Sequence, residues 1–145
     1  MRAFIQRSLS AHVSVDDKIV GQINHGLVVL LGIGREDTLE KGKKLIDKLL
    51  KYRIFDDENG KMGWNVAQAN GRILLISQFT LYANTHKGLR PDFAPAMPPA
   101  EAEALYDALL SYLQSQYQHV AAGIFAADMQ VHLINDGPVS FMLEV

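Results

Sequence analysis

Two short segments of this chain place hydrogen-bonding side chains directly against strongly apolar runs. The first, Ser77 to Ala83 with the sequence SQFTLYA, follows the apolar run Ile73 to Ile76. Ser77 and Thr80 carry hydroxyls, and the Gln78 amide can both donate and accept hydrogen bonds. Strand ends are where sheets present polar groups to ligands, so this segment is a candidate catalytic or binding site. The alternative is a strand end whose polar side chains only cap backbone groups.

The second segment, Asn135 to Ser140 with the sequence NDGPVS, lies between two apolar runs. Its asparagine, aspartate and glycine are typical of a turn. The Gly137–Pro138 bond could be cis, as about 5–6% of X-Pro bonds are in folded proteins. A fixed Gly-Pro carbonyl would form a rigid wall that is sensitive to stereochemistry. The alternative is an ordinary hairpin loop.

Other motifs indicate less. Gly32-Ile33-Gly34 sits where a dinucleotide-binding fingerprint would begin, but Asp37 takes the place of its third glycine, which favours a tight turn. The run Asp56 to Gly60 lacks the acidic twelfth residue of a calcium loop, which favours a hairpin turn. No two histidines have the spacing of a zinc-binding helix, so we expect neither a metal nor a cofactor. The histidines are His12, His25, His86, His119 and His132.

The composition bounds the class of protein. The 145 residues, 48% of them hydrophobic, suit one domain over residues 1–145. The absence of cysteine excludes disulfides and cysteine nucleophiles. A net charge of −2 argues against a protein that coats nucleic acid, but not against one that grips only its end. The N-terminus lacks a signal-peptide core, and the longest apolar run, Leu27 to Leu31, is too short to span a bilayer. We therefore expect a cytosolic protein that does not enter the membrane.

Alternation and apolar runs predict eight strands. The longest alternating run is Leu9, Ala11, Val13 and Val15, and Leu27 to Ile33 is apolar on both faces, as in a central strand. Turns are expected at Asp16-Asp17 and at Asn24 to Gly26. The predicted strands are Leu9 to Val15, Ile19 to Ile23, Leu27 to Ile33, Tyr52 to Phe55, Arg72 to Ser77, Ile124 to Ala126, Met129 to Ile134 and Ser140 to Val145.

Two helices are also predicted. Thr38 is a suitable N-cap for a helix of about 14 residues. Pro98-Pro99 opens a second helix, after the long irregular loop Asn84 to Pro98, and loops of that length are often functional. The apolar faces are Leu39, Gly42, Leu45, Ile46, Leu49 and Leu50 in the first helix, and Ala102, Leu105, Leu109 and Leu113 in the second. The fold class is α/β, or α+β: a mixed, largely antiparallel, barrel-like sheet with two main helices packed on it.

Together the two segments resemble the D-aminoacyl-tRNA deacylase family. The first resembles that family's S-Q-F-T-L motif and the second its N-x-G-P-V-T motif. The similarity spans the chain, since it extends to Met1-Arg2-Ala3, Gly60-Lys61-Met62, Lys87-Gly88, Arg90-Pro91 and Ala127-Asp128-Met129. Ser140 departs from the family's threonine, which keeps the hydroxyl but loses a methyl group. Gly63-Trp64 also departs, and no role is assigned to it.

The resemblance implies hydrolysis of the ester that joins a D-amino acid to the acceptor end of tRNA. It implies a homodimer with the active site at the subunit interface, where a cis Gly137–Pro138 bond inserts into the partner's site and rejects L-amino acids. Removal of glycine mischarged on alanine tRNA is implied as well. The catalytic residues would be Thr80 and Gln78, and the substrate-binding residues Ser77, Phe79, Met129, Gly137 and Pro138.

Two mechanisms remain open, attack by the Thr80 hydroxyl or attack by water. The ester carbonyl would dock near Ser77 to Thr80, where backbone N–H groups stabilise the oxyanion, with Gln78 and Phe79 lining the adenosine pocket. Thr80 is the only nucleophile that the motif offers, but no histidine or aspartate stands near it in sequence to activate it. We therefore favour attack by water, assisted by the terminal ribose 2′-OH.

Three further readings stay open. Lys87 and Arg90 are candidate phosphate contacts, or only solvated loop charges. A non-catalytic module that binds tRNA ends or free D-amino acids is a rival function from a different class. A nucleotide-binding fold that uses Gly32 and Gly34 is a third.

Overall fold

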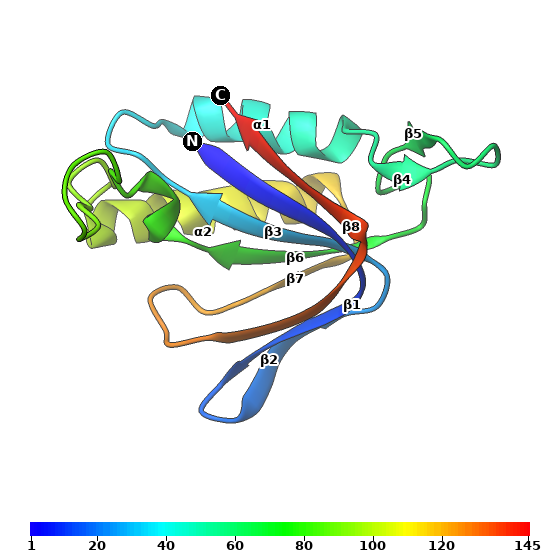
Figure 1. Cartoon of the computed structure of the whole chain (residues 1–145), viewed down its shortest axis with the longest axis horizontal. Coiled ribbons are helices and arrows are strands. Elements are labelled where there is room, and N and C mark those ends of the chain that lie inside the picture. The colour runs from blue at the N-terminus through cyan, green and yellow to red at the C-terminus, as the bar shows by residue number, and fades with distance from the viewer.

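The long strand β1 (Arg2–Val15) organises a six-stranded sheet in the computed structural model, which describes residues 1–145 (Figure 1). On one edge β1 pairs antiparallel with β8 (Gln130–Glu144). On the other edge it pairs first with β2 (Lys18–Ile23) and then with β3 (Gly26–Gly32). The strand was expected to begin at Leu9, but it begins at Arg2 because earlier alternating positions are buried as well.

The expected turn at Asn24 to Gly26 is a bend and not a reversal. Asp16 and Asp17, both with positive φ, form the hairpin turn after β1, as predicted. Beyond that turn both β2 and β3 run antiparallel to β1, and Gly21 to Ile23 have the same register on β1 as β3, so the two strands form a single arm bent at Asn24 and His25.

The other edge of the sheet is parallel. β6 (Arg72–Ser77), with the predicted bounds, pairs parallel with β3, and β7 (Val120–Ala122) pairs parallel with β6. The path of strands nearly closes on itself, because Gly21 of β2 lies against β7: a Cβ at Gly21 would stand 2.6 Å from the Ala122 carbonyl oxygen. The predicted mixed, barrel-like sheet is therefore confirmed.

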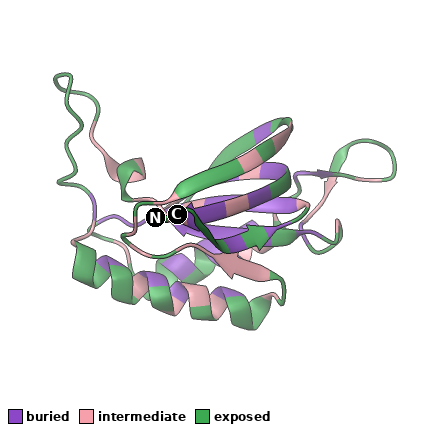
Figure 2. Ribbon diagram, turned by 90° about the horizontal axis from the view of Figure 1, so that it is seen from below, coloured by how far each residue is buried: buried purple, intermediate pink, exposed green.

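Two helices cover one face of the sheet. α1 (Leu39–Lys51) begins where predicted, since Thr38 Oγ1 accepts a hydrogen bond of 3.2 Å from the Lys41 N–H. α2 (Pro99–Gln116) begins at the predicted proline pair. Both helices bury their inner sides in the larger core with β1, β3 and β6, and a smaller core fills the curl of the sheet. Figure 2 shows buried positions on the strands and on the inner sides of the helices, while the tips of the long loops are exposed. Neither helix combines the length and hydrophobicity that a bilayer-spanning helix requires.

Two predictions of short strands are wrong. Tyr52 to Phe55 is not a strand; β4 (Phe55–Asp56) begins only at its last residue and pairs with β5 (Met62–Trp64) in a separate ribbon. Ile124 to Ala126 lies in a turn, and β7 comes before it. Ile124 is 47% exposed, so its apolar character does not mark a buried strand.

The most important correction concerns the C-terminal third. Two strands joined by a hairpin loop were expected there, but Gln130 to Glu144 is one strand that passes through Gly137 and Pro138. Asn135 lies opposite Ser8 and Ser140 lies opposite Gln6, with a break in the register between them. The second segment is thus a bulge in a continuous strand, and its backbone direction is set by β1 on both sides.

Candidate functional site

The first segment lies at the C-terminal end of β6. After Ser77 the chain is anchored by the Gln78 N–H, which donates to the Leu31 carbonyl oxygen at 2.8 Å, and then enters the 3-10 helix η1 (Phe79–Tyr82). No side chain caps η1. Phe79 is 57% exposed and packs edge to face against Phe93 of the long loop. The segment therefore offers an aromatic face and polar side chains at the surface.

Thr80 has no base beside it. Its only side-chain partner is Gln78, whose amide Nε2 donates to Thr80 Oγ1 at 2.5 Å. An amide cannot take up the hydroxyl proton, but by donating to the oxygen it leaves the Thr80 proton free to be donated to another acceptor. This arrangement suits a hydroxyl that positions a ligand, and it does not suit an activated nucleophile.

η1 is fixed by residues from the start of the chain and from the turn before α1. Arg2 donates to the Leu81 carbonyl oxygen at 2.8 Å, and its guanidinium lies 4.6 Å from the centre of the Tyr82 ring. The Tyr82 hydroxyl donates to Asp37, which also accepts from the Gly34 N–H at 2.6 Å. Burial and the Asp37 carboxylate raise the pKa of Tyr82 far above its ordinary value, so the phenol stays a neutral donor. The residue patterns gave no sign of this support.

The glycines Gly32 and Gly34 serve this packing. A side chain at either position would collide with η1: the Cβ at Gly32 would stand 2.9 Å from the Leu81 Cβ, and the Tyr82 ring fills the space beside Gly34. The approach of η1 therefore explains why these two positions are glycine.

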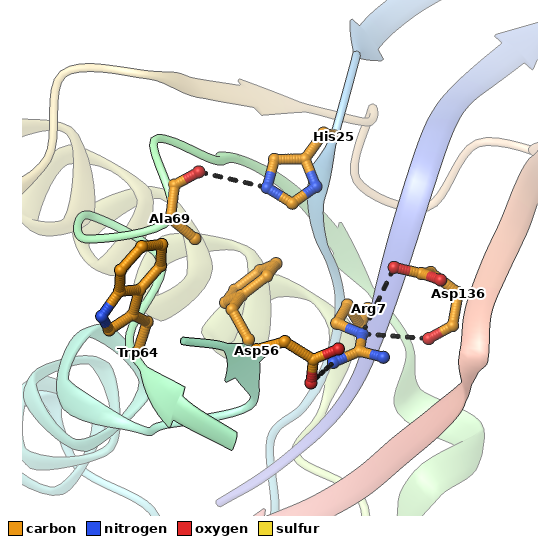
Figure 3. A pocket seen from close by; sticks show the side chains of 7 residues that line it. Arg7, His25, Asp56, Trp64, Ala69 and Asp136 are labelled. Carbon is orange, nitrogen blue, oxygen red and sulfur yellow. Dashed lines mark hydrogen bonds and ion pairs between the residues drawn. The ribbon is translucent and has the colours of Figure 1, made fainter. Parts of the chain in front are cut away.

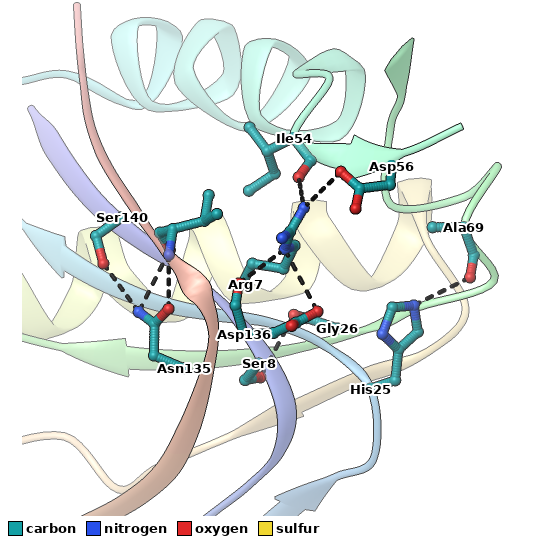
Figure 4. Close-up of polar contacts among 11 residues, drawn as sticks. Arg7, Ser8, His25, Gly26, Ile54, Asp56, Ala69, Asn135, Asp136 and Ser140 are labelled. Atoms are coloured by element: carbon teal, nitrogen blue, oxygen red, sulfur yellow. Dashed lines mark hydrogen bonds and ion pairs between the residues drawn. The ribbon is translucent and has the colours of Figure 1, made fainter. Parts of the chain in front are cut away.

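The second segment is held in shape by Asn135 (Figure 4). Its Oδ1 accepts from the Val139 N–H at 2.6 Å, and its Nδ2 donates to the Ser140 hydroxyl at 3.0 Å. The hydroxyl that Ser140 shares with threonine thus has a structural contact. Gly137 and Pro138 are exposed, and the peptide bond between them is cis.

Arg7, which the sequence analysis did not single out, ties the second segment to the body of the protein (Figure 4). Only 6% exposed, it donates from Nε to the Asp136 carbonyl oxygen at 3.0 Å and from Nη1 to the Ile54 carbonyl oxygen at 2.9 Å. A second contact from Nη1 reaches Asp56 at 3.2 Å. A signal existed, because Arg7 continues the inward phase of Ala3 and Ile5, but it lies before the residue at which the strand was expected to begin.

A small open pocket lies beside Arg7 (Figure 3). It has a volume of about 180 Å³ and includes Trp64, the residue left without a role, as part of its wall. His25 shares the wall and contacts the Ala69 carbonyl oxygen at 3.2 Å. The guanidinium of Arg7 is already bonded to Asp56 and to Asp136, so this pocket carries no free positive charge. Neither here nor elsewhere in the chain do three histidine, aspartate or glutamate side chains gather as metal ligands would.

The structure does not bring the two segments together within one chain. Across the sheet, Ser77 of β6 pairs with Leu31 of β3, which pairs with Ala3 of β1. Asn135 of β8 pairs instead with Ser8 of β1. Five residues of β1 separate the two levels, which is about 17 Å along the strands. Ser77 therefore lies at the end of β6, whereas Asn135 is level with Gly26 and Arg72, where β3 and β6 begin.

Other expected site residues lie on the Ser77 side. Met129 packs against the core that contains Ile76. Lys87 and Arg90 are exposed in the loop whose Phe93 contacts Phe79.

Comparisons with known proteins agree on one family. Residues 4–144 match the family model described as D-Tyr-tRNA(Tyr) deacylase. A D-aminoacyl-tRNA deacylase of Acinetobacter baylyi is 70% identical over 145 residues, covering 100% of this chain and 99% of that protein. One of Cellvibrio japonicus is 54% identical over the same length, with the same coverage of both.

Two solved structures have the same fold. One is described as the c-Myc DNA unwinding element binding protein; it is 41% identical, with a TM-score of 0.96, and the match covers 100% of this chain and 99% of that one. The other, described as a probable eukaryotic D-amino acid tRNA deacylase, is 18% identical with a TM-score of 0.86, and the match covers 99% and 98%. At that identity the second likeness speaks for the fold alone.

Proposed function

Since this chain belongs to the D-Tyr-tRNA(Tyr) deacylase family and is a hydrolase of D-aminoacyl-tRNA, we propose that its two polar segments divide the reaction between them. The Ser77–Thr80 strand end holds the ester and the terminal adenosine. The Gly137–Pro138 bulge of a second subunit selects the D-amino acid. The reaction takes place in the cytoplasm, where aminoacyl-tRNA is made.

At the strand end, catalysis rests on positioning. The observation that carries this part is the contact of Thr80 with Gln78 alone, which supplies no general base. Water attacks the ester carbonyl with help from the ribose 2′-OH of the substrate, and backbone N–H groups of the Ser77–Thr80 segment stabilise the oxyanion. Phe79, exposed beside Phe93, gives the adenine a face to stack on.

Chirality is read by the second segment. Enantiomers have equal volume and hydrophobicity, so neither property separates them, whereas a rigid wall close to the α-carbon can reject one by steric clash. The bonds from Asn135 to Val139 and from Arg7 to Asp136 support such rigidity, because they hold the backbone on both sides of Gly137 and Pro138. Glycine has no side chain to reject, so glycine mischarged on alanine tRNA is also removed.

The site is completed across a homodimer. Separation of the two segments by about 17 Å along the strands leaves each incomplete within its own chain. β8 pairs only with β1, so its other edge has unpaired N–H and C=O groups that a second chain can use. Large apolar side chains on β8 are also exposed, which favours burial against a partner. They are Val131, Ile134, Phe141 and Met142.

Incubation with D-Tyr-tRNA and with L-Tyr-tRNA tests the activity. Loss of the D-ester alone supports the proposal, and loss of neither overturns it. Thr80→Ala then separates the mechanisms: turnover within about tenfold of the unmodified protein fits a positioning hydroxyl, while complete loss with intact tRNA binding indicates a covalent role.

Mixed dimers test the shared site. A Thr80→Trp/Pro138→Gly double variant blocks its own strand end and removes its own wall, so neither it nor the unmodified protein should hydrolyse L-Tyr-tRNA. After subunit exchange, half of the dimers are mixed and each has one site with an intact strand end facing a missing wall. L-ester hydrolysis should therefore appear at about a quarter of the rate of the Pro138→Gly homodimer. If mass spectrometry detects mixed dimers and no L-ester is lost, the wall does not act across subunits.

The rival function is a non-catalytic nucleic-acid binder. It is favoured by the name of one similar solved protein, which refers to binding of a DNA element. Tight binding of duplex DNA without hydrolysis of any aminoacyl-tRNA would support this rival. The net charge of −2 argues against it, because binding through many phosphates needs a broad positive surface.

A further inference from the structure

Helix α1 carries a straight row of four exposed lysines on its outer side. They recur at spacings of three, four and three residues, which places them on one line along a helix. The row is Lys41, Lys44, Lys48 and Lys51. The opposite side of the helix is buried and consists of Gly42, Leu45, Ile46 and Leu49.

The row concentrates positive charge on a chain whose net charge is −2. The acidic side chains of α1 neutralise little of it: Glu40 pairs with Lys44 at 3.6 Å in an exposed contact, and the Asp47 carboxylate accepts a hydrogen bond from Tyr112 of α2. Near the helix start, Glu36 offers only its carbonyl oxygen, which accepts from Lys41 Nζ at 3.0 Å. The outer side of α1 thus keeps a net positive charge.

Helix stability explains only part of this arrangement. Lys48 and Lys51 lie in the last turn of α1, where positive charge interacts favourably with the helix dipole. Lys41 and Lys44 lie in the first half of the helix, where the dipole does not favour them, and like charges three and four residues apart repel each other. A binding partner with negative charge at regular intervals would offset this repulsion.

The row also starts beside the candidate site. Asp37, four residues before Lys41, accepts the hydrogen bond from Tyr82 of η1. From there α1 runs away from η1 (Figure 1). The ten residue steps from Lys41 to Lys51 span about 15 Å along the helix axis. If one end of a long ligand is bound at η1, the adjoining part of that ligand can therefore lie along the lysine row.

We propose that this lysine row binds backbone phosphates of the tRNA acceptor stem, an inference that rests on the proposed function. Double-stranded nucleic acid carries about one negative charge per 1.7 Å of axis, so 15 Å of helix faces several phosphates. Lysines bind phosphates as point charges and read no sequence, which suits an enzyme that meets many tRNAs.

The test compares two triple variants with the same change in charge. The row variant is Lys44→Gln/Lys48→Gln/Lys51→Gln, and the control is Lys18→Gln/Lys43→Gln/Lys61→Gln, built on other exposed lysines. Glutamine has nearly the helix propensity of lysine, so α1 should persist in the row variant. Each protein is assayed on D-Tyr-tRNA, on the D-tyrosyl ester of adenosine alone, and for binding to uncharged tRNA by fluorescence anisotropy.

We expect the row variant to raise KM for D-Tyr-tRNA and Kd for uncharged tRNA about tenfold or more, with kcat unchanged. The slope of log KM against log salt should flatten by about 2 to 3, roughly one for each lost phosphate contact. Hydrolysis of the adenosine ester should stay within about twofold, and so should every value for the control.

Equal effects of both triple variants, or an unchanged salt slope, would overturn the proposal. Equal loss on the adenosine ester would also overturn it, because that substrate has no stem. A row that binds duplex DNA as tightly as tRNA would assign the surface to DNA instead. If the unmodified protein hydrolyses neither ester, the proposed function fails, and the anisotropy measurement still decides whether the row binds tRNA.

Discussion

Replacing Arg7 with methionine should release the second segment from the body of the protein. Methionine keeps an unbranched apolar side chain of similar length in β1, so packing is largely preserved while every polar contact of the guanidinium is lost. These contacts join Asp136 of the bulge to Ile54 and Asp56, which lie next to the end of α1. The change therefore isolates the hydrogen bonds of one buried cation.

The structure sets the size of the effect. The ion pairs contribute little, because the Asp56 and Asp136 side chains are 58% and 40% exposed and such pairs are worth about 0–1 kcal/mol. The two hydrogen bonds to carbonyl oxygens have a charged donor and a buried side chain, so each contributes about 1.5–3 kcal/mol. The expected loss in free energy of unfolding is about 3–6 kcal/mol, a large part of the total stability of an ordinary domain.

Urea unfolding at one fixed protein concentration measures this loss. With a slope of about 2 kcal/mol per molar urea, the midpoint should fall by about 2 M. Arg7→Lys should lose less, because its ammonium can still reach one carbonyl oxygen. Arg53→Met is the control: this arginine is exposed and unpaired, so its replacement should change stability by less than about 0.5 kcal/mol. A loss below 1 kcal/mol for Arg7→Met would refute the view that Arg7 fixes the bulge.

Three further changes have definite expected outcomes. Asn135→Ala removes the bonds to Val139 and should cost about 1–3 kcal/mol in urea unfolding while raising hydrolysis of L-Tyr-tRNA; an unchanged L-to-D ratio would contradict the proposed wall. Gly42→Ala, normally favourable in a helix, should destabilise by about 1–2 kcal/mol because the new Cβ would lie 2.7 Å from Leu109 Cδ1 in the core; a more stable variant would contradict this packing. Burial raises the pKa of Tyr106 to about 12, so above pH 10 the unfolded chain loses this proton first. Stability should then fall with rising pH up to about pH 12, by up to about 1.4 kcal/mol per pH unit, and Tyr106→Phe should flatten that fall.

The sequence predicted the elements whose signals are local. The Thr38 cap, the proline pair before α2 and the bounds of β6 were all read correctly, because caps, prolines and apolar runs act within a few residues. The fold class followed from the order of these elements. The strand prediction failed next to β7, because the apolar residues of the exposed turn at Ile124 to Ala126 resemble a short strand.

Long-range pairing is what the sequence could not show. Asn135 to Ser140 has the composition of a hairpin turn, yet β1 pairs with the residues on both sides of it, so that the strand continues through the bulge. The local preference for a turn is weaker than the two stretches of backbone hydrogen bonds to β1. No residue near Gly137 in the sequence indicates that β1 will pair there. The same holds for Arg7, whose partners lie 47 and 129 residues away in sequence.

The placement of the two motifs bears on the shared site that the family resemblance implies. As sequence signals they gain strength from occurring together. The register of β1 does not place them side by side in one chain, since Asn135 is level with Ser8 and Ser77 with Ala3, five residues apart along the strand. If they act on one substrate, a second subunit has to bring them together, and the contacts of Arg7 and Asn135 take on a purpose beyond stability. A wall offered to another subunit must keep its shape before that subunit arrives, and it can do so only if its own chain holds it.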